Sequence, residues 1–401
     1  RIHTLAPVLG LLLLPSASAL SGQSTAAWVP EPARGQSFEL SIRSVMRGPE
    51  LTGSSPTAVR WTDDGRWLYF RWLPGGAAWD AEPALYRVAA QGGEPVRLDD
   101  AAAREAAPLL SGGDLSPDRR WRVTAVEGDL RLVDRRTLAV RRLTWTEDGE
   151  SSPLFSTDGS AVLFRRGNDL YRLSLSSGTL EQLTRIVAGP APKDSAEAEG
   201  QRKFLVDQQL ELFEHIRREK AREDARKARQ AAADSLEPKT VFIDPSERVQ
   251  SLDPTRDGRY VVVRVAKQAQ DAKSTVVPDW ITADGYTWNI NGRTKVGDAQ
   301  GESRVGLLTT ATGAITWLDT APEGYEPKEK PGVFSVGWND AGTRAFLFAV
   351  SWDNKDRWLW GVEAVTGQRT LLDHLRDEAW VGGPCFASCV TFIPGTDRVA
   401  F

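Results

Sequence analysis

Residues with reactive or metal-binding side chains are scarce in this sequence. Its 401 residues include only two cysteines and three histidines. His3 lies in an apolar N-terminal stretch, His215 in a charged segment, and His374 just after a strand-like segment. A structural zinc site needs about four Cys, His, Asp or Glu ligands, and the sequence offers no such cluster. We therefore expect no metal site and no cofactor.

The two cysteines are Cys385 and Cys389, which are separated by three residues and lie beside Gly382-Gly383-Pro384. In an exported protein this pair can oxidise to a disulfide that closes a small loop. Two half-buried thiols near a turn fit the same spacing. The sequence leaves both alternatives open.

Recognised catalytic motifs are also missing. The sequence has no G-x-S-x-G nucleophile elbow, no P-loop, no H-E-x-x-H and no dinucleotide-binding fingerprint. Its net charge of -4 lacks the basic excess that nucleic-acid binding requires. We expect no catalytic residue within residues 1–401 and no nucleic-acid partner.

Only one long apolar run occurs, at Leu5–Ala19, and it ends in the small residues Ala17-Ser18-Ala19. This pattern predicts a secretory signal peptide over residues 1–19, followed by a lead-in segment over 20–54. A membrane anchor is the alternative, but the run is shorter than the roughly 20 apolar residues of a spanning helix. We therefore expect export to the periplasm or the extracellular space, with no membrane span in the mature chain. Because the chain begins with Arg1, we also expect a start codon further upstream.

What the sequence does contain is a repeat. The hairpin-like segment LYRLSLSSGTLEQL (170–183) is matched without gaps at 85–98, 130–143, 305–318 and 359–372. Each copy opens and closes on an aliphatic residue, and glycine stands eight residues after the first in four of the five, with Leu138 as the exception. Glycine suits a turn that needs a positive φ.

A second repeated element precedes each copy. Segments such as WTDDGRWLYF, FSTDGSAVLF and PTRDGRYVVV lead from an Asp-containing turn into an apolar strand. These turns hold Asp64, Asp118, Asp158 and Asp257, so their recurrence indicates a structural role. Each unit therefore reads as four antiparallel strands, which is typical of a β-propeller blade.

The sequence predicts an all-β fold, a β-propeller of four-stranded antiparallel blades over residues 55–401. Blades fall near residues 55–100, 110–147, 150–186, 246–320 and 333–374, and a sixth begins at VTFIPGTDRVAF. Because the last segment stops in mid-strand, we expect the domain to continue and to hold seven or eight blades in the complete protein. A β-sandwich is less consistent with five copies of one hairpin.

Two insertions interrupt the blades. Residues 194–233 are rich in helix-forming residues and predict a helical arm, docked through Phe204, Leu205, Leu212, Phe213 and Ile216. Residues 271–302 are rich in Gly, Asn and Asp and carry three aromatic residues, Trp280, Tyr286 and Trp288. A functional loop and a plain hairpin extension both fit the second insertion.

Four features of the sequence carry a resemblance to a known family. They are the blade FSTDGSAVLF…NDLYRLSLSSGTLEQLT, the segment DEAWVGGP (Asp377–Pro384), the exported N-terminus and the helical arm. In these features the sequence resembles the N-terminal propeller of the prolyl oligopeptidase family, dipeptidyl peptidase IV branch. TolB-like propellers share the blade motif. The resemblance covers residues 55–401.

This resemblance implies a serine peptidase whose propeller gates a C-terminal α/β-hydrolase domain with a Ser-Asp-His triad, expected beyond Phe401. It implies peptide substrates, that hydrolase domain as partner, and a homodimer. The family's dipeptidyl peptidases hold the substrate amine with a Glu-Glu pair, for which Glu211 and Glu214 on the arm are the nearest analogues. Dipeptidyl, oligopeptidase and acylaminoacyl specificities stay open, and a stand-alone propeller that binds a protein or glycan is the alternative function.

Overall fold

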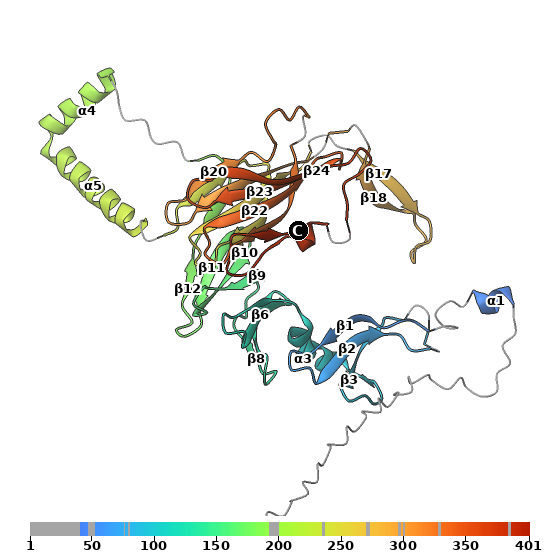
Figure 1. Ribbon diagram of the computed structural model, residues 1–401. Coiled ribbons are helices and arrows are strands. Elements are labelled where there is room, and N and C mark those ends of the chain that lie inside the picture. Colours follow the sequence, from blue (N-terminus) through green and yellow to red (C-terminus); the bar gives the residue numbers. More distant parts are fainter. Residues whose placement is uncertain are drawn as a thin grey trace, which may run out of the picture. The chain divides into compact units, whose positions relative to one another are not determined.

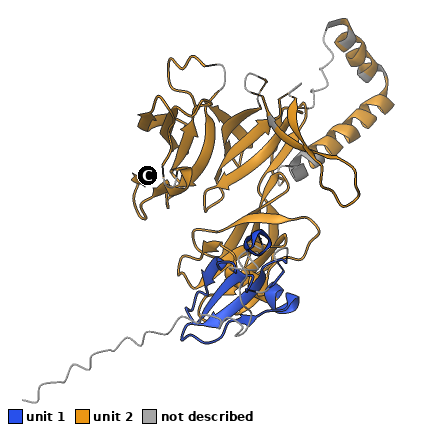
Figure 2. Cartoon of the chain, turned by 90° about the vertical axis from the view of Figure 1, so that its right-hand side faces the viewer, with its two compact units in different colours: residues 1–104 blue, residues 105–401 orange. Residues whose placement is uncertain are grey.

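The structure of the protein is a computed structural model, whose described residues are 41–46, 53–75, 77–78, 81–191, 200–234, 237–269, 273–295, 298–299, 301–327, 330–383 and 386–401. The predicted signal peptide (1–19) and most of the lead-in segment (20–54) lie outside them. The chain forms two compact units, residues 1–104 and 105–401 (Figure 2).

The described residues form five four-stranded antiparallel sheets (Figure 1), and in each sheet the strands lie in chain order. Sheet 1 holds β1 (Thr57–Trp61), β2 (Trp67–Trp72), β3 (Ala84–Ala89) and β4 (Val96–Arg97). Sheet 2 holds β5 (Asp114–Leu115), β6 (Trp121–Val126), β7 (Asp129–Asp134) and β8 (Val140–Arg142). Sheet 3 holds β9 (Glu150–Phe155), β10 (Ala161–Arg166), β11 (Asp169–Ser174) and β12 (Leu180–Gln182). Sheet 4 holds β15 (Glu247–Pro254), β16 (Tyr260–Lys267), β19 (Glu302–Thr309) and β20 (Ala314–Leu318). Sheet 5 holds β21 (Gly332–Trp338), β22 (Arg344–Val350), β23 (Asp356–Glu363) and β24 (Arg369–Arg376).

The remaining elements connect or interrupt these sheets. The helices are α1 (Ile42–Val45), α3 (Asp100–Leu110), α4 (Gly200–Leu212), α5 (Glu214–Asp234) and the 3-10 turn η1 (Phe386–Cys389). The two-stranded pairs are β13 (Arg185–Ala188) with β14 (Thr240–Ile243), β17 (Ser274–Asp279) with β18 (Trp288–Thr294), and β25 (Thr391–Phe392) with β26 (Val399–Ala400). The predicted all-β fold of four-stranded propeller blades with an inserted helical arm is confirmed. The five repeated hairpins are the third and fourth strands of the five sheets, and β25 and β26 pair where a sixth blade was predicted.

Strand β16 shows why the repeated strands are apolar on both faces. Val261 and Val263 are fully buried in a cluster shared with sheet 3, whereas Val262 between them is fully buried in a cluster shared with sheet 5. Successive side chains of a strand point to opposite faces. The run VVV therefore packs against a sheet on each side, as consecutive propeller blades do. Similar clusters join sheet 2 to sheet 3 and sheet 5 to β25 and β26.

The repeated aspartates are structural, as predicted. Asp158 accepts hydrogen bonds from the Ser156 hydroxyl (2.6 Å) and from the Ser160 backbone N–H (3.0 Å) and hydroxyl (2.7 Å). Two turns of sheet 2 lack the glycine of the other blades: Arg119 and Leu138 stand in its place, and both adopt positive φ (57° and 60°). A positive φ costs a residue with a side chain roughly 1 kcal/mol, so sheet 2 contains local strain at both turns.

These turn aspartates predict a specific response to acid. Hydrogen bonds, first of all from Ser116, Ser156 and Ser351, hold the pKa values of Asp118, Asp158 and Asp353 below their usual range. Because the folded pKa is depressed, this stability is present above the unfolded value of about 3.9 and is lost as pH falls through the folded pKa. We expect the melting temperature, followed by circular dichroism, to fall steeply below about pH 4. The variant D118N/D158N/D353N should show a shallower slope, and an unchanged slope would contradict this account.

Arginines of one sheet bind the next sheet at its bulges. The first strands β15 and β21 each contain a β-bulge, with Gln250 and Phe334 as the extra residues. Arg165 of β10 donates to the carbonyl oxygens of Gln250 (2.5 Å) and Val249 (2.8 Å). Arg264 of β16 takes the same place in the next blade and donates to the carbonyl oxygen of Val333 (3.2 Å). A bulge leaves backbone groups without ladder partners, and these arginines satisfy them.

Candidate functional surfaces

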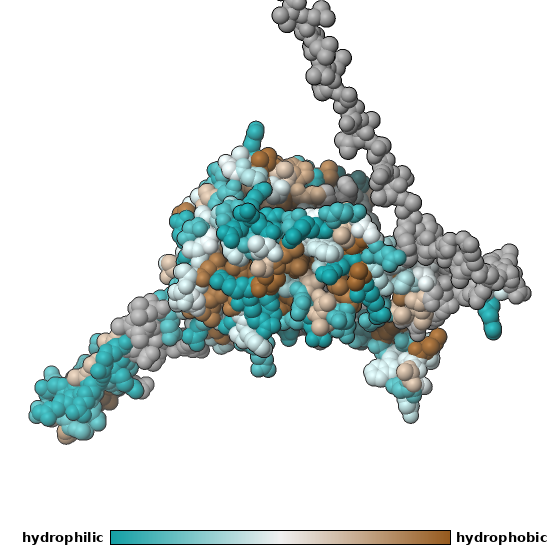
Figure 3. Space-filling view, turned by 90° about the horizontal axis from the view of Figure 1, so that it is seen from below, coloured by the Kyte–Doolittle hydropathy of each residue, from teal (hydrophilic) through white to brown (hydrophobic). Residues whose placement is uncertain are grey.

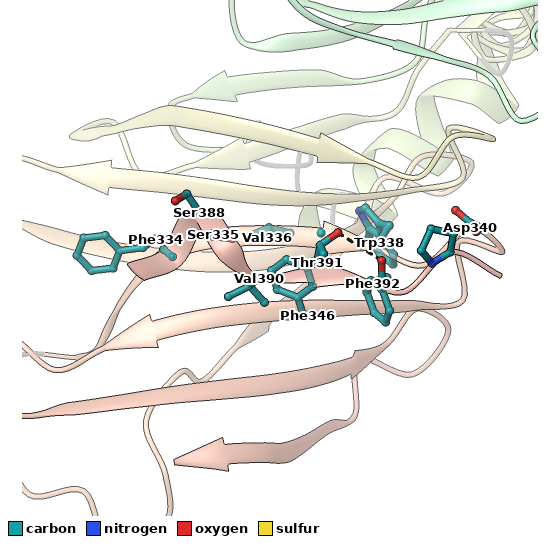
Figure 4. Close-up of a pocket in the computed structure, with 13 residues that line it drawn as sticks. Phe334, Ser335, Val336, Trp338, Asp340, Phe346, Ser388, Val390, Thr391 and Phe392 are labelled. Carbon is teal, nitrogen blue, oxygen red and sulfur yellow. Dashed lines mark hydrogen bonds between the residues drawn. The ribbon is translucent and has the colours of Figure 1, made fainter. Parts of the chain in front are cut away.

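A pocket of about 630 Å³ lies between β21 and the segment of η1 and β25 (Figure 4). Its walls combine the aromatic residues Phe334, Trp338, Phe346 and Phe392 with the hydroxyl side chains of Ser335, Ser388 and Thr391. Asp340 is the one ionisable residue of its lining, and its carboxylate accepts the Gly395 backbone N–H at 2.7 Å. A pocket with this lining can receive an apolar side chain, and its one carboxylate is held by the Gly395 backbone N–H.

The second insertion, left open by the sequence, is a β-hairpin within sheet 4. Strands β17 and β18 pair with Val277 opposite Ile290, and both side chains are more than half exposed. Trp280 and Tyr286 in the connecting turn are each 76% exposed. Trp288 is 61% exposed, so the hairpin presents aromatic and aliphatic side chains on its surface.

The first insertion is the helical arm, residues 200–234, formed by α4 and α5 (Figure 1). It leaves sheet 3 through β13 and returns through β14, and these two strands pair in parallel from Arg185 with Thr240 to Ala188 with Ile243. The parallel strand pair β13–β14 therefore holds the two ends of the arm close together. The arm itself is mostly hydrophilic on its surface (Figure 3).

The apolar residues of the arm do not dock as the sequence predicted. Phe204, Leu205 and Phe213 are 52–65% exposed, and the side chain of Leu212 lies outside the described residues. Leu205 and Ile216 instead line an open groove of about 620 Å³ between α4 and α5. The error arose because helix formation depends on local sequence, whereas docking depends on a partner surface.

Glu211 and Glu214 flank the break between α4 and α5 at Phe213 and are both exposed. The Glu214 carboxylate forms an ion pair with Arg218 at 2.5 Å, one helical turn away. Neither glutamate lines the groove of the arm. The structure therefore does not bring these two carboxylates together at a cavity, and an amine-binding role for them stays a prediction.

The two described histidines have structural partners. The Nε2 atom of His374 lies 2.8 Å from Asp356, and its ring stacks on Trp358. His215 pairs with Glu219 at 3.4 Å on the arm. Within the described residues, no hydroxyl or thiol hydrogen-bonds to either imidazole, so neither can serve as the base of a Ser-His pair here.

Three further predictions concern sites and membranes. Cys389 lies in η1, but Cys385 lies outside the described residues, so the disulfide stays a prediction. The described part of the chain holds no cluster of three or more potential metal ligands. Among its helices, none is both long and apolar enough to cross a bilayer.

No protein-family model and no curated protein matches this sequence. Solved structures similar to it include dipeptidyl peptidase 4 of Porphyromonas gingivalis, with 12% identity, a TM-score of 0.43, and coverage of 90% of this chain and 45% of that one. A putative dipeptidyl aminopeptidase IV of Bacteroides ovatus has 11% identity, a TM-score of 0.38, and coverage of 85% and 40%. TolB of Acinetobacter baumannii has 13% identity, a TM-score of 0.30, and coverage of 82% and 55%. The chain thus spans less than half the length of either peptidase.

Proposed function

We propose that this chain is the substrate-gating propeller of an exported serine peptidase, whose Ser-Asp-His triad lies in an α/β-hydrolase domain that follows it. The observation that carries the proposal is the arm. It is a long helical insertion that contributes no strand to any blade, and its charged and apolar side chains are exposed. A feature of this kind has no role in the stability of the sheets, so it is available for peptide recognition.

The blades support the proposal in a second way. Their repeated aspartates, buried apolar strands and bulge-binding arginines all have structural roles, and none forms an activated nucleophile. Acyl transfer requires a hydroxyl or thiol with a base in reach and preorganised oxyanion donors. The chemistry of this peptidase therefore belongs to another domain, and the propeller admits and positions peptides.

The test is reactivity toward a fluorophosphonate probe of serine hydrolases. We expect the full-length gene product to be labelled and to cleave peptide amides, and substitution of its elbow serine to abolish both. The 401-residue chain alone should do neither. Labelling of the 401-residue chain would reveal a nucleophile within it. An unlabelled full-length product would favour the stand-alone binding propeller instead.

A further inference from the structure

Helix α5 has two faces with different charge patterns. With 3.6 residues per turn, Arg218, Arg222, Arg226 and Arg229 fall within a sector of about 80°. We call these four residues the arginine ridge. All are exposed. Each stands three or four residues from the next, so the ridge places like charges on successive turns.

The opposite face is charge-paired. Lys220 forms an ion pair with Asp224 at 3.3 Å, and Lys227 forms one with Glu223 at 2.9 Å, both at the i, i+4 spacing. On the ridge, Arg218 pairs with Glu214 at the first turn. Arg222, Arg226 and Arg229 form no ion pair with any residue that the structure describes.

This difference separates the ridge from an ordinary solvated helix face. Opposite charges at i, i+4 stabilise a helix by roughly 0.2–0.5 kcal/mol, and like charges destabilise it by similar amounts. The ridge therefore weakens the isolated helix, whereas the paired face strengthens it. An anionic partner bound along the ridge would offset the repulsion between neighbouring arginines and so stabilise the helix.

The geometry indicates what kind of anion fits. The ridge extends over 12 residues, and the 11 steps between its ends give about 16 Å at 1.5 Å per residue, with about 6 Å between arginines four residues apart. In an extended peptide, alternate side chains lie on one face about 6.7 Å apart, and about five residues cover 16 Å. Acidic side chains at alternate positions of an extended peptide would therefore meet successive arginines.

We propose that the arginine ridge binds extended peptides that carry acidic residues at alternate positions, and that such peptides are a favoured substrate class of the proposed peptidase. The claim that these peptides are substrates rests on the proposed function. The binding of the peptides to the ridge does not, because binding requires no hydrolysis. A lipid surface is a poorer match, because interfacial helices bury a broad face of large apolar side chains. Beside the ridge, α5 offers only alanines such as Ala221 and Ala225.

The test is fluorescence anisotropy of a labelled heptapeptide with Glu at positions one, three, five and seven and Ser between them. It uses the intact 401-residue chain at an ionic strength of about 0.1 M, where charges more than about 10 Å apart are largely screened. We expect this peptide to bind at least about tenfold more tightly than its Gln counterpart, and the binding to weaken with added salt. The ridge variant R222Q/R226Q/R229Q should lose about tenfold in affinity, as expected for three exposed ion pairs. Gln forms helix as readily as Arg, so circular dichroism should show the arm intact.

A matched control removes three positive charges from elsewhere on the same helix. The variant R217Q/K220Q/K227Q should keep the affinity within about twofold, because net charge alone contributes only a weak, screened attraction. Equal losses in both triple variants, or equal binding of the Glu and Gln peptides, would overturn the proposal. Ridge-dependent binding to phosphatidylglycerol vesicles without peptide binding would also overturn it, in favour of a lipid partner. If the ridge binds peptide but the full-length product shows no hydrolase labelling, the proposed function fails while the binding surface stands.

Discussion

Replacing Arg264 with methionine will lower the free energy of unfolding by about 2–4 kcal/mol. Arg264 donates to the Ser251 hydroxyl (2.6 Å) and to the Val333 carbonyl, and its guanidinium lies 3.5 Å from the Asp253 carboxylate. Methionine keeps much of the packing but leaves the Val333 carbonyl and the carboxylate without this partner. Urea unfolding monitored by tryptophan fluorescence measures the loss.

The pH dependence of this variant gives an independent check. Burial raises the pKa of Asp253, and the Arg264 charge opposes that rise. Without Arg264 the folded pKa should rise further, and stability that is present below the unfolded pKa is then lost as pH rises through the folded pKa. The deficit of R264M should therefore be larger at pH 8 than at pH 5, and D253N should reduce it. A deficit that does not change with pH would contradict an electrostatic role for Arg264.

The matched control is R344M in the same kind of strand. Arg344 pairs with Glu363 at 2.8 Å, but both side chains are about half exposed. Exposed pairs of this kind contribute about 0–1 kcal/mol. A comparable loss in R344M and R264M would mean that the contact with the bulge has no special importance.

Deletion of the arm from the full-length product will lower kcat/KM for peptide substrates by about tenfold or more, with little change in stability. The design is simple because β13 and β14 already lie side by side, so a Gly-Ser linker of about eight residues can replace residues 192–238 and span the ladder. Loss of substrate positioning without loss of the fold accounts for the expected effect. The measurements are steady-state kinetics and the melting temperature.

Two outcomes separate the possible roles of the arm. If turnover and melting temperature both stay unchanged, the arm has no part in substrate handling. If the protein fails to fold, the arm is structural, and the ridge variant then becomes the way to test recognition. Fluorophosphonate labelling of the deletion variant should persist, because the proposed triad lies outside the arm.

The blades could be predicted from the sequence because their signals are local. A continuous apolar run such as Val261 to Val263, an Asp turn such as Asp158, and a turn glycine such as Gly178 are all signals that act within a few residues. Their recurrence then fixes the strand order. Leu138 replaces the glycine of the other four hairpins, but the turn keeps its conformation because Leu138 also adopts a positive φ.

Contacts between distant segments were missed because no local pattern encodes them. The parallel pairing of β13 with β14 joins two short apolar runs, Arg185–Ala188 and Thr240–Ile243, on opposite sides of the arm. The hydrogen bonds of Arg165 to the bulge at Gln250 join residues 85 apart. One feature of the sequence could have indicated these arginine contacts. Arg165 and Arg264 occupy the same position in their repeats, each directly after three apolar residues that follow an Asp turn. Helix α3 follows β4 and precedes β5 in the chain, outside the repeat, and it begins with Asp99 accepting the Ala102 N–H at 2.8 Å.

The arginines at the bulges also give the array a direction. Arg165 belongs to sheet 3 and binds sheet 4, and Arg264 belongs to sheet 4 and binds sheet 5, so each contact runs from an earlier blade to a later one. A chain that crosses a membrane from its N-terminus delivers these blades in the same order. Strands β15 and β21 would then find the guanidinium groups of Arg165 and Arg264 already in place on the preceding sheet. Vectorial emergence would thus spare sheets 4 and 5 a period with unpaired carbonyl groups at these two bulges.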